Sequence, residues 1–138
     1  MAQERGPIVV VEDDTTVRQL IGEILRHAGY QVVEFGGAEE ALAFLETVQP
    51  ALITLDLAMP CVDGFRFLRL LQQRPGVAHV PVVVVTAAPE FLRSSVAVLG
   101  HPVVAKPFLM SQLIGAVERS LEMRPSANQP NATTEMRQ

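Results

Sequence analysis

Five side chains able to do acid, metal or phosphate chemistry each stand at the end of a short apolar run of this sequence: Glu12, Asp13, Asp56, Thr86 and Lys106. Short apolar runs that are rich in β-branched residues and bounded by turn residues are typical of buried strands. In an open parallel sheet, ligands bind in the crevice beyond the carboxyl ends of the strands. We therefore expect these five side chains to meet at one edge of a sheet, with Asp56 at the centre.

The chemistry that such a group supports is phosphoryl transfer. Three converging carboxylates would raise one another's pKa values unless a cation held them ionised, and Mg²⁺ is a hard cation that prefers oxygen ligands. Lys106 would add an ammonium group and Thr86 a hydroxyl that can donate a hydrogen bond. Phosphoryl transfer depends mostly on positioning and on neutralising the charge of the phosphoryl oxygens. Asp56 is then the predicted nucleophile, and the product is an aspartyl phosphate.

The elements that would position these residues alternate between strands and helices. Strands are predicted over residues 8–11, 31–35, 52–55, 82–86 and 103–105. Helices are predicted from Asp14 or Thr15 to Gly29, over Ala38–Val48, from Gly64 to about Arg74, over Pro89–Leu99 and over Met110–Met123. Continuous apolar strands indicate a parallel sheet with helices on both faces. The predicted fold class is therefore a doubly wound α/β sandwich.

Helical spacing of apolar residues predicts which helix faces pack on the sheet. For the first and second helices these positions are Val17, Leu20, Ile21, Ile24 and Leu25, and then Ala41, Leu42, Leu45 and Val48. For the third and last helices they are Phe65, Leu68 and Leu71, and then Met110, Leu113, Ile114, Val117 and Leu121.

Composition limits the classes of protein to which the chain can belong. With 138 residues, 49% of them apolar, a single folded domain is expected over residues 1–123. From Arg124 the chain is polar, and residues 124–138 are predicted to be a disordered tail. A net charge of −4 argues against nucleic-acid binding, and no apolar run is long enough for a membrane span. One cysteine, Cys61, and no signal peptide indicate a cytoplasmic protein.

Four motifs in the expected order resemble the receiver domain of response regulators in bacterial two-component signalling, the CheY-like superfamily. They are Val10–Asp14, Asp56–Pro60 with Asp63–Gly64, Val85–Ala87, and Lys106–Phe108. The resemblance covers roughly residues 7 to 123. It implies a flavodoxin-like (βα)5 fold whose five parallel strands lie in the order 2-1-3-4-5.

The resemblance also implies a metal site. Glu12 and Asp13 would form the acidic pair, with Asp13 the more direct ligand of Mg²⁺ or Mn²⁺. Asp56 and the backbone carbonyl of Ala58 would complete the protein's share of the coordination.

Two further residues would act on the phosphoryl group. Thr86 would move toward the phosphoryl oxygens, and the small Ala87 beside it would allow this movement. Lys106 would pair with the phosphoryl group, and its peptide bond to Pro107 would be cis. Proline lowers the preference for the trans form to about 1 kcal/mol or less, so a cis bond is physically reasonable here.

The same resemblance implies a signalling switch that is no enzyme beyond its own phosphoryl transfer and dephosphorylation. We expect either a stand-alone receiver or a domain of a longer protein, and Met1 with the polar tail favours the stand-alone receiver. The phosphoryl donor would be a histidine kinase or a histidine phosphotransfer protein. The output would be contact with an unknown downstream protein, without nucleic acid or membrane.

One departure from the family pattern concerns this output. The aromatic switch residue of the family falls on Val103, which cannot make the same rotamer change. A receiver-like docking module that signals without phosphorylation is therefore the alternative function.

Two other classes of protein fit the sequence less well. A phosphatase or dehalogenase would need a second acid where Ala58 stands, and a flavin carrier would not place Glu12–Asp14 in its phosphate loop.

Other polar residues have simpler interpretations. Asp14 is expected to serve the following helix as a cap or as helix-terminal charge. Cys61 has no basic neighbour in sequence that would lower its pKa, so we expect it to be unreactive. His27, His79 and His101 show no metal-ligand spacing.

Overall fold

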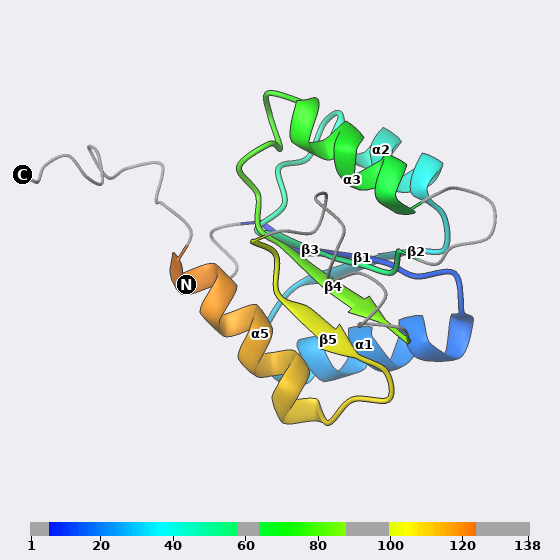
Figure 1. Ribbon diagram of the computed structural model, residues 1–138, viewed down its shortest axis with the longest axis vertical. Helices are drawn as coiled ribbons and strands as arrows, with labels where there is room; N and C mark the ends of the chain where they lie inside the picture. Colours follow the sequence, from blue (N-terminus) through cyan, green and yellow to red (C-terminus); the bar gives the residue numbers. More distant parts are fainter. Residues whose placement is uncertain (1–5, 58–63, 88–99, 124–138) are drawn as a thin grey trace, which may run out of the picture.

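The computed structural model describes residues 6–57, 64–87 and 100–123 (Figure 1). The predicted carbonyl ligand Ala58, the single cysteine Cys61, the helix predicted over Pro89–Leu99 and the predicted tail over residues 124–138 lie outside the described residues.

The described residues form a parallel sheet of five strands in the order β2-β1-β3-β4-β5. The strands are β1 (Ile8–Val11), β2 (Val32–Phe35), β3 (Leu52–Leu55), β4 (Val82–Thr86) and β5 (Val103–Ala105). Val11 pairs with Leu55, and Thr86 pairs with Ala105, so β1 ends level with β3 and β4 ends level with β5. Leu55 pairs with Val84, so β4 extends two residues further than β3. Both the predicted fold class and the predicted strand order are confirmed.

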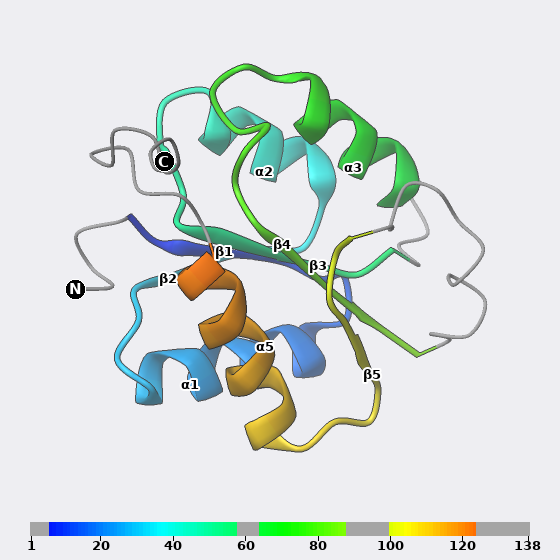
Figure 2. The same ribbon diagram turned by 60° about the vertical axis from the view of Figure 1, so that its left-hand side comes forward.

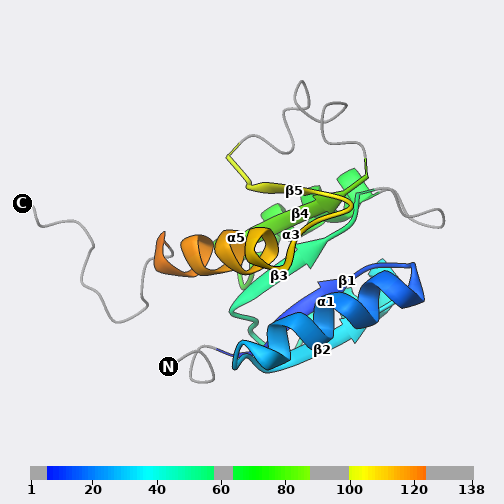
Figure 3. The same cartoon turned by 90° about the horizontal axis from the view of Figure 1, so that it is seen from below.

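Helices cover both faces of this sheet. α2 (Ala38–Leu45) and α3 (Gly64–Gln73) lie on one face, and α1 (Thr15–His27) and α5 (Met110–Met123) lie on the other (Figures 1 and 2). Figure 3 shows α1 and α5 in front of the sheet. Among the described residues, no helix has both the length and the apolar character needed to cross a membrane.

The strands contribute to two separate cores. Alternate residues of β1 point to opposite faces: Val9 and Val11 pack with α2 and α3, whereas Ile8 and Val10 pack with α1 and α5. A strand covered on both faces has no exposed side, which explains why β1 is apolar at every position.

The structure corrects several predicted helix positions. Leu20 and Met110 were expected in the core, but they are 48% and 57% exposed. Leu20 lies at the margin of the apolar stripe of α1, and Met110 is the first residue of α5. Phe67, which the predicted spacing omitted, is fully buried. α2 ends at Leu45 rather than at Val48.

Gly64 has a steric role at the start of α3. A Cβ atom at this position would overlap the Cα atom and the carbonyl group of Leu57, just past the end of β3. The absence of a side chain therefore lets α3 begin against the backbone that follows Asp56.

Candidate functional site

The candidate site begins with two buried carboxylates at the ends of β1 and β3. Because Val11 pairs with Leu55, the next residues, Glu12 and Asp56, lie side by side. The Asp56 N–H donates a hydrogen bond to the Val11 carbonyl at 3.1 Å, so the pairing continues past the strand end. Both side chains are buried, whereas Asp13 is exposed.

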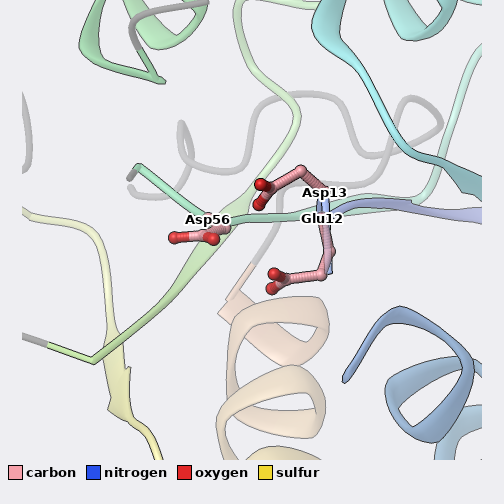
Figure 4. A group of neighbouring side chains, drawn as sticks. All are labelled: Glu12, Asp13 and Asp56. Carbon is pink, nitrogen blue, oxygen red and sulfur yellow. The ribbon is translucent and has the colours of Figure 1, made fainter. Parts of the chain in front are cut away.

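Glu12, Asp13 and Asp56 form a set of oxygen ligands for one cation. Each offers a carboxylate oxygen, and these three oxygens all lie within 4.8 Å of one another. Figure 4 shows the Asp13 and Glu12 side chains diverging from the end of β1 and the Asp56 carboxylate beside them. Carboxylate oxygens at this spacing suit a hard divalent ion such as Mg²⁺.

Lys106 brings a positive charge to the same two buried carboxylates. Its Nζ lies 2.9 and 3.1 Å from the two Glu12 carboxylate oxygens and 3.4 Å from Asp56 Oδ2. The Lys106 N–H donates to the Thr86 carbonyl at 2.8 Å, which fixes the residue directly after β5. The peptide bond from Lys106 to Pro107 is cis.

The electrostatics of this group favour a bound cation. Burial raises the pKa of Glu12 from 4.5 to about 7, and the Asp56 charge adds to the rise, while Lys106 opposes it. Burial alone would lower the pKa of Lys106, but Glu12 and Asp56 together raise it above its usual value. One ammonium therefore does not neutralise the carboxylates, and the donor set and charge fit a divalent metal ion.

Thr86 is the last residue of β4 and is buried. β4 neighbours β3 in the sheet, so Thr86 stands at the same edge as Asp56. The structure thus brings Glu12, Asp13, Asp56 and Lys106 together and places Thr86 beside them. Val103, the position of the family's aromatic switch, lies on β5 and is 39% exposed.

Two residues near the acidic pair make further hydrogen bonds, one to the start of α1 and one to the backbone of Glu12. Asp14 caps α1, as expected, by accepting a hydrogen bond from the Val17 N–H at 3.1 Å. Arg18 was not identified from the sequence: its Nη1 donates to the Glu12 carbonyl oxygen at 2.9 Å. The spacing of six residues matches no common local motif, so only the folded loop reveals this contact.

Comparisons with known proteins agree with this geometry. The family model described as "Response regulator receiver domain" matches residues 8–118. The DNA-binding transcriptional regulator NtrC of Salmonella typhimurium is 29% identical over 130 residues, which are 92% of this chain and 27% of that protein. This chain therefore spans about a quarter of that relative's length.

Two solved structures are similar along nearly their whole length. The receiver domain of a signal transduction histidine kinase from Syntrophus aciditrophicus has 30% identity and a TM-score of 0.76, covering 90% of this chain and 97% of that one. The response regulator TrrA from Thermotoga maritima, solved in complex with Mg²⁺-BeF, has 25% identity and a TM-score of 0.74, covering 83% and 97%.

Proposed function

This chain belongs to the response regulator receiver domain family, and from that premise we propose that it is a phosphorylation-dependent switch whose phosphoacceptor is Asp56. The observation that carries the proposal is that the buried Asp56 carboxylate belongs to a cluster of three carboxylates and lies 3.4 Å from the Lys106 ammonium. This combination supplies a nucleophile, ligands for a cation and a fixed positive charge within one group.

In the proposed reaction, an Asp56 carboxylate oxygen attacks the phosphorus atom of a phosphohistidine. The new O–P bond forms as the N–P bond breaks, and the imidazole leaves with the electron pair and takes up a proton. Lys106, already 3.4 Å from Asp56, pairs with the phosphoryl oxygens, and the Thr86 hydroxyl donates to one of them. Asp56 then carries the phosphoryl group as a mixed anhydride.

Glu12, Asp13 and Asp56 are the described residues that would hold Mg²⁺ or Mn²⁺. The bound ion would neutralise the charge that gathers on the phosphoryl oxygens during transfer. Lys106 supplies one positive charge beside three carboxylates, so a bound divalent ion would bring the group closer to neutrality.

We propose a histidine kinase or a histidine phosphotransfer protein as the donor, and a downstream protein as the receiver of the signal. Phosphorylation would bias two arrangements of the segments that carry Thr86 and Lys106, since both residues would then bind a new anion. The only chemistry proposed for the chain is its own phosphoryl transfer and dephosphorylation. Nothing in the described residues favours the docking module that signals without phosphorylation.

The test is the intact-protein mass after incubation with Mg²⁺ and acetyl phosphate. We expect one added phosphoryl group on the wild type and none on Asp56→Asn or in the presence of a chelator. Asp14→Asn is the matched control, because it changes a nearby carboxylate that caps α1, and it should be phosphorylated like the wild type. No adduct on the wild type with acetyl phosphate or with phosphorylated histidine kinases would refute the proposal.

A further inference from the structure

The two helices on one face of the sheet carry opposite charges. The segment 36–50, which contains α2, has three acidic residues and no Lys or Arg, and the segment 64–76, which contains α3, has three basic residues and no Asp or Glu. These residues are Glu39, Glu40, Glu46, Arg66, Arg69 and Arg74. Each helix alone is an ordinary solvated surface, but together they form an acidic row beside a basic row.

The two rows point to solvent and are not paired with each other. The three glutamates, Arg66 and Arg69 are exposed, and Arg74 is partly exposed. Within the described ranges, no salt bridge joins any of these six side chains to another residue. Among the described residues, these charges therefore face solvent rather than one another.

The two helices are held next to each other. α2 and α3 lie together above the sheet in two views (Figures 1 and 2) and share one apolar core. Beyond their carboxyl ends, the side chains of Gln49 and His79 meet, with nitrogens 3.3 Å apart. Both helices run in the same direction, since each follows a strand of one parallel sheet.

The rows also match in length. Glu39 lies on α2 and Glu46 is the cap directly after it, seven residues on, which is about 11 Å at the rise of a helix. Arg66 lies on α3 and Arg74 directly follows that helix, eight residues on, which is about 12 Å at the same rise. A second copy rotated by 180° about an axis parallel to the helices would place its α3 over α2. Helix direction would be preserved, so Glu39 would face Arg66 and Glu46 would face Arg74.

We propose that the α2–α3 face is a homodimer interface in which the acidic row of each copy binds the basic row of the other. A second copy of this chain carries both complementary rows, so its basic row can face the acidic row and its acidic row can face the basic row. An unrelated partner would need its own acidic and basic rows at the same spacing. In a two-fold dimer every contact occurs twice, so few pairs suffice for a specific, weak and salt-dependent association. The interface leaves out Asp56, so the dimer does not depend on the proposed phosphorylation.

Sedimentation equilibrium over a range of protein concentrations tests the proposal. We expect a monomer–dimer equilibrium at about 0.01 M salt that weakens at least tenfold at about 1 M, because the screening length falls from about 30 Å to about 3 Å. Asp56→Asn should dimerise like the wild type, which separates this result from the phosphorylation experiment. A wild type that stays monomeric at low salt, or a dimer that salt does not weaken, would overturn the proposal.

Charge reversal locates the interface. Glu39→Lys with Glu46→Lys, and separately Arg66→Glu with Arg74→Glu, should each abolish self-association, because each change reverses one side of both proposed pairs. An equimolar mixture of the two variants should form a heterodimer. The matched control is Glu118→Lys with Glu122→Lys on exposed positions of α5, which changes the net charge as much as the α2 pair and should leave the dimer intact. Reversed variants that still self-associate would assign dimerisation to another face. A mixture that stays monomeric would show that the acidic and basic rows do not bind each other, and either result would contradict the proposal.

Discussion

The pH dependence of stability offers a direct test of the buried acidic site. Burial raises the pKa of Glu12 in the folded state from 4.5 to about 7. Between these values the folded protein binds more protons than the unfolded chain, so the free energy of unfolding falls as the pH rises. Protonated Glu12 makes its full contribution to the free energy of unfolding below pH 4.5, and this contribution is lost as the pH rises through about 7.

The size of this effect follows from the two pKa values. The difference between 4.5 and about 7 corresponds to about 3 kcal/mol, at about 1.4 kcal/mol for each tenfold change in proton affinity. Glu12 is only 1% exposed, so solvent screening does little to reduce this amount. The raised pKa of Lys106 acts in a separate window above pH 10.5 and does not overlap with this one.

The measurement is urea unfolding followed by circular dichroism from pH 4.5 to pH 8, in the presence of a chelator. The difference in free energy of unfolding between the wild type and Glu12→Gln should fall by about 3 kcal/mol over this range, because only the wild type can ionise here. The exposed Glu118→Gln is the control for removal of a carboxylate elsewhere. A difference that is constant with pH, or that grows in favour of the wild type, would refute the electrostatic account.

Mg²⁺ should reduce this pH dependence, because a cation bound at Glu12 favours the ionised carboxylate. The same unfolding series repeated with Mg²⁺ in place of the chelator measures this change. If the two series coincide at every pH, the acidic cluster does not bind the ion.

Three substitutions probe the remaining contacts. Lys106→Met should destabilise the metal-free protein by about 3 kcal/mol, because it leaves buried carboxylates without their cation, and added Mg²⁺ should restore part of the loss in thermal unfolding. Thr54→Val should stabilise the protein by about 1 kcal/mol in urea unfolding, since the buried Thr54 hydroxyl has no hydrogen-bond partner in the described part of the chain. A loss of stability would show that the hydroxyl is hydrogen-bonded in solution. Gly64→Ala should cost about 2 kcal/mol in the same assay through its clash with the Leu57 backbone, and an unchanged midpoint would contradict that packing.

The strand ends could be predicted from the sequence because their signal is local. A run such as Ile8–Val11 is apolar at every position, which only a strand covered on both faces tolerates. A polar residue directly after such a run must therefore stand at the sheet's carboxyl edge. This reasoning located Glu12, Asp56 and Lys106, and the structure brings all three within contact distance.

Contacts and exposure at helix margins were decided only by the tertiary structure. The spacing of apolar residues predicts which face of a helix is buried. The packing of the helix on the sheet then decides whether the residues at the edges of that face are covered or exposed. For this reason Leu20 and Met110 are exposed and Phe67 is buried.

The hydrogen bond from Arg18 to the Glu12 carbonyl and the adjacency of the α2 and α3 charges likewise depend on how distant segments pack. The sequence by itself determined where the chemistry lies, because charged residues that directly follow an apolar strand must stand at the carboxyl edge of the sheet. The folded chain decided what surrounds that chemistry, because contacts between separate elements leave no periodic trace in the sequence.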